Sequence, residues 1–63
     1  MNNIDSIRKK KALSYGDIAK ESGLTPTYIH LLAKGKRNNP SLDVMQKISQ
    51  ALGEKVEKVF KIN

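Results

Sequence analysis

The chain has 63 residues and no cysteine, and its 12 lysines and arginines outweigh 6 acidic residues to give a formal charge of +6. This length predicts one domain, residues 1–63, while the missing cysteine excludes disulfides, thiolate nucleophiles and cysteine-based zinc sites. His30 is the single histidine and has no acidic cluster beside it, no stretch is apolar enough to cross a membrane, and the first residues lack the basic-then-apolar pattern of a signal peptide. We therefore expect a cytoplasmic protein without metal.

The first two predicted helices follow from apolar spacing and capping signals. No segment alternates with a period of two for long enough to indicate a strand. Two isoleucines three residues apart predict a first helix over residues 3–11. Ser14 is followed three residues later by Asp17, an acidic variant of the capping box, so a second helix is expected to begin there. Gly23 is placed to end that helix in the left-handed conformation.

A third helix is predicted over residues 26–34. Thr25 is a good N-cap, and Pro26 suits the first helical position because its missing N–H would have no partner there. Ile29 and Leu32 are expected to face the core. The outward face then consists of small, polar or basic residues with one leucine: Thr25, Pro26, Thr27, His30, Leu31 and Lys34.

Two more helices complete the prediction. The fourth is expected to follow Pro40, with Ser41 as its cap, and to end at Gly53. The spacing of the last apolar residues indicates a short fifth helix, whose cap position holds Lys55, a poor capping residue. The predicted fold is therefore all-α, a bundle of five short helices.

The second and third helices, joined by a short turn that contains glycine, describe a helix-turn-helix. Residues 7–53 read IRKKKALSYGDIAKESGLTPTYIHLLAKGKRNNPSLDVMQKISQALG. This stretch resembles the Cro/CI-type (Xre) helix-turn-helix repressor family, most closely in the IA…SGLT turn, the GKRN-P-SL loop and the KI…ALG close. The resemblance implies a compact, five-helix, lambda-repressor-like DNA-binding domain, with the third helix in the DNA major groove.

The resemblance also implies residue roles. The base-reading residues would be those of the outward face, Thr25, Pro26, Thr27, His30, Leu31 and Lys34. Phosphate contacts would come from residues flanking that face, with the Tyr28 hydroxyl as an added donor: Ser14, Tyr15, Tyr28, Lys36, Arg37 and Asn38. A homodimer would pair through the region of the fifth helix, with Val56, Val59 and Phe60 as candidates.

Two positions depart from the family's usual pattern. Tyr15 stands where the family often has glutamine, so the amide bond to phosphate would become a phenolic one or be lost. Ala33 stands where the family usually has a glutamate that pairs with the arginine matching Arg8. Because a buried, unpaired arginine is costly, we expect Arg8 to be partly hydrated or paired with another carboxylate.

The sequence thus predicts a sequence-specific regulator of transcription, most simply a repressor, that binds double-stranded DNA as a homodimer and needs no cofactor. An alternative is a protein-interaction module of the same fold, such as an antitoxin or antirepressor-binding subunit, which would show little affinity for duplexes. A third reading is nonspecific binding to nucleic acid or membrane surfaces through charge alone. An enzyme is the least expected class, since no nucleophile–base set, carboxylate pair or P-loop is visible.

Overall fold

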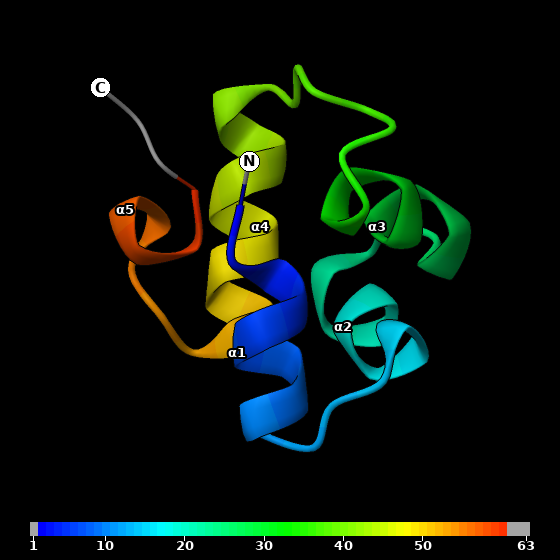
Figure 1. Ribbon diagram of the computed structural model, residues 1–63, viewed down its shortest axis with the longest axis vertical. Coiled ribbons are helices and arrows are strands. Elements are labelled where there is room, and N and C mark those ends of the chain that lie inside the picture. Colours follow the sequence, from blue (N-terminus) through cyan, green and yellow to red (C-terminus); the bar gives the residue numbers. More distant parts are fainter. Residues whose placement is uncertain (1, 61–63) are drawn as a thin grey trace.

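A computed structural model describes residues 2–60 and contains five helices in this part of the chain (Figure 1). The helices are α1 (Ile4–Lys10), α2 (Tyr15–Ser22), α3 (Pro26–Ala33), α4 (Leu42–Leu52) and α5 (Val56–Val59). The only β-type pairing among the described residues is an isolated bridge between Asn2 and Phe60. The all-α prediction is therefore confirmed.

The three predicted N-caps are present. The Ser14 hydroxyl accepts a hydrogen bond from the Asp17 N–H at 2.9 Å, and the Asp17 carboxylate accepts one from the Ser14 N–H at 2.9 Å, which completes a capping box. Thr25 caps α3 by accepting from the Tyr28 N–H at 3.1 Å, and Ser41 caps α4 in the same way. Each of these bonds satisfies a first-turn donor that has no partner within its own helix.

The helix ends differ slightly from the prediction. Gly23 ends α2 with φ of +75°, as expected. In contrast, α1 is one residue shorter at each end than the predicted range, and α3 already ends at Ala33, with Lys34 as its C-cap. Lys55 forms no side-chain cap, and α5 is only four residues long before the chain becomes extended at Phe60.

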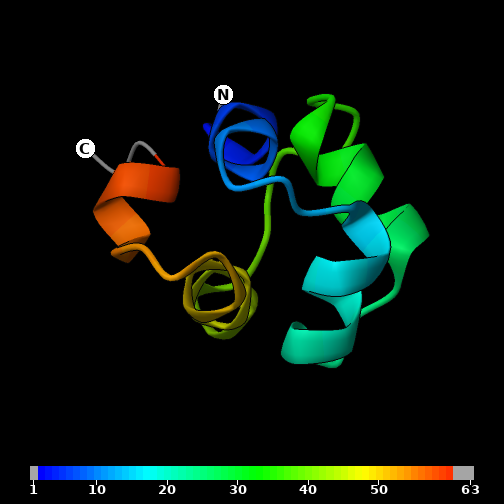
Figure 2. The same cartoon turned by 90° about the horizontal axis from the view of Figure 1, so that it is seen from below.

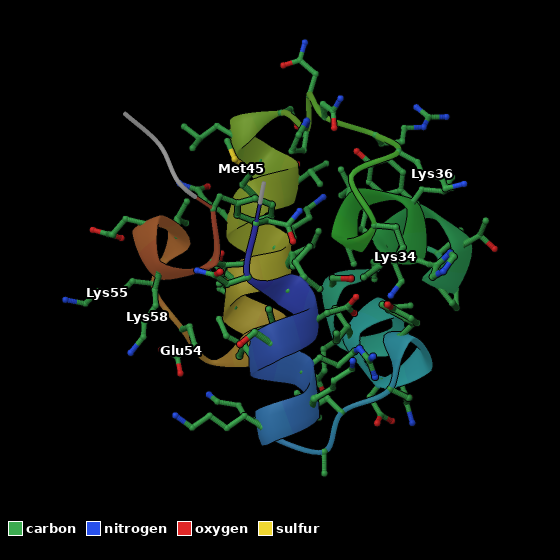
Figure 3. The ribbon with its side chains drawn as sticks, viewed as in Figure 1. Lys34, Lys36, Met45, Glu54, Lys55 and Lys58 are labelled. Carbon is green, nitrogen blue, oxygen red and sulfur yellow. The ribbon has the colours of Figure 1, made fainter. Side chains whose placement is uncertain are left out.

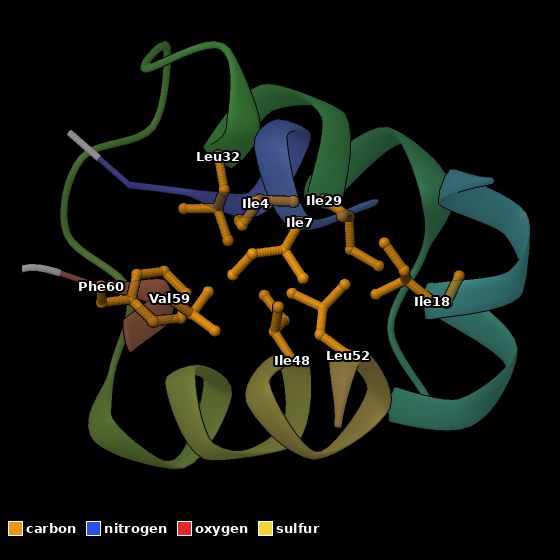
Figure 4. Close-up of a cluster of buried hydrophobic side chains, with 10 residues drawn as sticks. Ile4, Ile7, Ile18, Ile29, Leu32, Ile48, Leu52, Val59 and Phe60 are labelled. Carbon is orange, nitrogen blue, oxygen red and sulfur yellow. The ribbon is translucent and has the colours of Figure 1, made fainter. Parts of the chain in front are cut away.

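The helices surround one apolar core (Figures 1, 2 and 4). In both ribbon views α1 and α4 lie between α5 on one side and the α2–α3 pair on the other, and α2 packs against both α3 and α4. The buried apolar side chains come from all five helices and from the residue directly after α5: Ile4, Ile7, Ile18, Ala19, Ile29, Leu32, Ile48, Leu52, Val59 and Phe60. The α2–α3 pair is thus fixed on the bundle by its inner face, which leaves its outer face exposed.

The N-terminal segment connects α3 with α5. The side-chain amide of Asn2 donates to the Leu32 carbonyl at 2.7 Å, at the end of α3. Asn3 donates through its side chain to the Lys58 carbonyl at 2.8 Å and through its backbone N–H to the Val59 carbonyl at 2.7 Å. These bonds hold the short α5 against the start of α1, even though α5 lacks a side-chain cap.

The predicted dimer surface needs a correction. Val59 is fully buried and Phe60 is 6% exposed, because both side chains lie in the same apolar core as Leu32 and Ile48 (Figure 4). They are not available to a partner without opening the domain. Val56 is half-buried, so it is the one member of the predicted set that retains surface, whereas Leu42 at the start of α4 is 59% exposed.

Candidate nucleic-acid interface

The turn between α2 and α3 fixes how the third helix is presented. Gly23 has φ of +75° and ψ of 12°, a left-handed conformation that glycine adopts without a Cβ penalty. Thr25 then caps α3 while Pro26 occupies its first turn, so the chain changes direction within three residues. Ala19 and Ile29 are buried on the inner faces of the two helices. The helix-turn-helix is therefore a capped unit whose two helices pack through their inner faces.

Most of the residues predicted to face outward from α3 are exposed in the structure. Thr25, Pro26, Thr27 and His30 are exposed, whereas Leu31 is half-buried. An open pocket of about 490 Å³ lies at the N-terminal end of this face. Its walls are the turn, the outer side of α3 and the following loop: Gly23, Leu24, Thr25, Thr27, Tyr28, Leu31 and Arg37. Leu31 therefore forms one wall of a pocket that combines apolar surface with threonine hydroxyls.

The loop after α3 carries the expected cations. Lys36, Arg37 and Asn38 are all exposed, and Figure 3 shows Lys36 on the α3 side of the molecule. The backbone N–H groups of Lys36 and Arg37 both donate to the Leu31 carbonyl, at 2.9 and 3.2 Å, which fixes the start of the loop. The Arg37 guanidinium lies 5.7 Å from the centre of the Tyr28 ring, within cation–π range.

Three donors from three segments converge on one carboxylate, a group that we call the Asp5 cluster: Asp5, Arg8, Tyr15 and Lys34. Arg8 Nε lies 3.1 Å from Asp5 Oδ1, and Lys34 Nζ lies 2.9 Å from Asp5 Oδ2. The Tyr15 hydroxyl also donates to Oδ1, and the Arg8 guanidinium stacks 4.4 Å from the Tyr15 ring centre. Of the two outcomes expected for Arg8, hydration or pairing with another carboxylate, the structure shows the pairing.

This cluster changes the roles available to two predicted site residues. The single hydroxyl hydrogen of Tyr15 is directed to Asp5, so in this structure the residue makes no phenolic donation outward. The Lys34 ammonium is directed toward Asp5 on α1 rather than along the outer face of α3, contrary to its predicted orientation, although its side chain is 46% exposed. The three-residue spacing of Asp5 and Arg8 could have predicted their ion pair from the sequence. No local pattern indicated the contacts that Asp5 makes with Tyr15 and Lys34.

The contacts within the cluster shift the pKa of Asp5, Tyr15 and Lys34. Burial alone raises the pKa of Asp5, but the hydrogen bonds from Tyr15, Lys34 and Arg8 outweigh that effect and lower the pKa from 3.8 to about 2. Burial and then the bond to Asp5 raise the pKa of Tyr15, and the pair with Asp5 raises the pKa of Lys34. At neutral pH Asp5 and Lys34 consequently stay charged and Tyr15 stays neutral when the cluster forms.

Acid should weaken the domain through this cluster. Because the folded pKa of Asp5, about 2, lies below its ordinary 3.8, the contribution is complete above pH 3.8 and is lost as the pH falls toward 2. After allowance for solvent screening, the loss is about 1–2 kcal/mol. Urea unfolding of the wild-type protein and of Asp5→Asn, measured between pH 3.8 and pH 2, should show this loss in the free energy of unfolding for the wild type only. Parallel curves would contradict the expected role of Asp5.

Other classes of site find no support in the described part of the chain. Residues 2–60 contain no group of three or more histidines, cysteines or carboxylates arranged to hold a metal ion. Among the same residues, no helix has the length and apolar character needed to cross a membrane.

Comparison with known proteins finds a family model, a curated relative and a solved structure that this chain resembles. The helix-turn-helix family model HTH_3 matches residues 4–59. The HTH-type transcriptional regulator SlrR of Bacillus subtilis (strain 168) is 32% identical over 53 residues, which is 84% of this chain but only 35% of the relative's length. The crystal structure of the restriction-modification controller protein C.AhdI from Aeromonas hydrophila superposes with a TM-score of 0.85 and 31% identity, covering 92% of this chain and 86% of that one.

Proposed function

The chain belongs to the Xre-type helix-turn-helix family, and from this premise we propose that it is a cytoplasmic, sequence-specific regulator of transcription that inserts α3 into the major groove of double-stranded DNA. One observation carries the proposal. The capped α2–turn–α3 unit presents an exposed face of small and polar side chains, and the cationic loop of residues 36–38 adjoins it. A helix is the element that fits the major groove, and cations beside it meet the phosphates.

Base reading is assigned to the outer face of α3. Thr27 and His30 are exposed there and carry the hydrogen-bonding groups that discriminate between base edges. The pocket beside them has apolar walls from Leu24 and Leu31, which suit the methyl group of a thymine. Pro26 offers no donor, so direct reading involves few bases and DNA shape supplies further specificity.

Phosphate contacts are assigned to the two flanks of α3. The DNA backbone would be approached on one side by the loop, through Lys36, Arg37 and Asn38, and on the other by Ser14 at the start of α2. The Ser14 oxygen accepts from Asp17 within the capping box, which leaves its hydroxyl hydrogen to donate. These contacts position α3 and are independent of sequence.

Repression as a homodimer completes the proposal. A dimer with a two-fold axis would recognise a palindrome whose half-sites lie about one helical turn apart. Val56 is half-buried on α5 and keeps some exposed surface, so we place the pairing there. The relatives support regulation as the class of function, since one is a transcriptional regulator and the other a controller protein.

The salt dependence of binding tests the phosphate contacts. Lys36→Ala should weaken binding to all duplexes alike and reduce the slope of log affinity against log salt by about 0.9, because one phosphate contact is lost. Lys55→Ala removes the same charge from the α5 side, away from α3, and should change the slope much less (Figure 3). Fluorescence anisotropy with a labelled random-sequence duplex measures both slopes.

Two outcomes would contradict this assignment. Equal slope changes for Lys36→Ala and Lys55→Ala would mean that binding follows net charge and not the α3 face. No binding of any duplex at low salt would favour the alternative function, a protein-interaction module built on the same fold.

A further inference from the structure

We propose that Asp5 acts as an internal substitute for a DNA phosphate, holding the Lys34 ammonium in the free protein and competing with the DNA backbone for it. This inference rests on the proposed function and adds a residue outside the helix-turn-helix that limits how tightly the protein binds DNA of any sequence. Asp5 is therefore a positioning residue, which acts through Lys34.

The geometry of the Asp5 cluster resembles that of a bound phosphate. Both carboxylate oxygens accept charged or polar donors: Arg8 at 3.1 Å and the Tyr15 hydroxyl on Oδ1, and Lys34 at 2.9 Å on Oδ2. Carboxylate and phosphate oxygens bind the same charged donors at similar distances. A lysine that finds a carboxylate here therefore has the donor geometry for a phosphate oxygen.

The Asp5 cluster lies beside the surface that we propose contacts the DNA phosphates. Tyr15 is the first residue of α2 and follows the N-cap Ser14, a proposed phosphate contact, whereas Lys34 is the C-cap of α3. The carboxylate side chain of Asp5 is 22% exposed and the side chain of Lys34 is 46% exposed. An anion in solution can therefore approach the ammonium while it is still paired with Asp5.

The members of the cluster differ in how easily they can change partner. Arg8 is only 18% exposed and also donates to the Leu13 carbonyl at 3.1 Å and stacks on Tyr15, so it stays in place. Lys34 has no other bonded carboxylate among the described residues, and its pair with Asp5 is half-exposed. Ion pairs of this kind contribute little to stability, so a DNA phosphate is able to replace the carboxylate.

The exchange has a consequence for recognition. Breaking the Asp5–Lys34 pair costs the same on every DNA sequence, because Lys34 would meet the backbone and not the bases. Asp5 therefore lowers nonspecific and specific affinity together and keeps the nonspecific complex weak. This role gives a physical reason for an acidic residue so close to a surface that otherwise attracts DNA.

A charge-matched comparison tests the inference. Asp5→Asn removes the competing charge, whereas Glu21→Gln removes one charge from an exposed position on α2 that takes part in no ion pair of the described residues. We expect Asp5→Asn to bind a random-sequence duplex several-fold more tightly than Glu21→Gln and to steepen its salt slope by about 0.9, the value for one further phosphate contact. Adding Lys34→Ala to Asp5→Asn should remove that gain.

A measurement on the unaltered protein keeps the inference testable if Asp5→Asn does not fold. The carboxyl carbon-13 resonance of Asp5 should shift when a random-sequence duplex is added at neutral pH, because Lys34 leaves the carboxylate. An unchanged resonance would overturn the proposal, as would Asp5→Asn binding no more tightly than Glu21→Gln. If the wild type binds duplex but neither expected result is seen, only the role of Asp5 is contradicted. If the wild type binds no duplex, the proposed function is contradicted as well.

Discussion

Replacing Leu32 by alanine is expected to remove most of the stability of the domain. Leu32 is 1% exposed, and it packs in the core on the inner side of α3 (Figure 4). Truncating a buried leucine costs about 2–5 kcal/mol, because the lost transfer free energy is joined by the cost of the cavity. A domain of this size has a free energy of unfolding of roughly 3–9 kcal/mol in all. Leu32→Ala should therefore have little free energy of unfolding left and should be largely unfolded at physiological temperature.

Leu42→Ala is the matched control. It deletes the same atoms from a leucine that is 59% exposed, so it should change the free energy of unfolding by no more than about 0.5 kcal/mol. Urea unfolding followed by circular dichroism compares the two variants directly. Similar losses for both would mean that the core does not lie between α3 and the rest of the bundle as described.

The second large effect concerns recognition. The double variant Thr27→Ala with His30→Ala should keep its fold, since both side chains are exposed, but should lose its preference for a selected sequence. Losing about 1 kcal/mol at each position would weaken specific binding roughly thirtyfold. Binding to random-sequence duplex and its salt slope should change little, because the phosphate contacts remain.

The control for this variant lies on another helix. Gln46→Ala with Gln50→Ala removes two exposed polar side chains from α4 and should leave sequence preference unchanged. Competition binding between a selected duplex and a random one measures the preference of each protein. A full preference in the Thr27 and His30 double variant would remove the base-reading role from the outer face of α3.

Local signals explain why the helices were predictable from sequence. The caps Ser14, Thr25 and Ser41 act within their own first turns, so spacing alone identified them. The end of α1 was less predictable. Ala12 adopts a positive φ of 57° after it, a conformation that alanine rarely takes and that the surrounding chain must impose.

Tertiary placement explains what the sequence did not reveal. Val59 and Phe60 form a short apolar run near the end of the chain, a pattern that suits a partner surface and a core equally, and the structure places both in the core. Lys34, Tyr15 and Asp5 are far apart in sequence, and only the packing of α1 against the α2–α3 pair brings them together. The roles of Thr27, His30 and Lys36 at DNA stay predictions.

Selection from a random pool of duplexes, run in parallel with the wild type and with the Thr27 and His30 double variant, tests the central claim most directly. The account predicts that the wild type enriches a palindrome whose half-sites lie about one helical turn apart. The double variant should enrich no such sequence while still retaining duplex. Enrichment of the same palindrome by both proteins, or of no sequence by the wild type, would contradict the claim that α3 reads DNA.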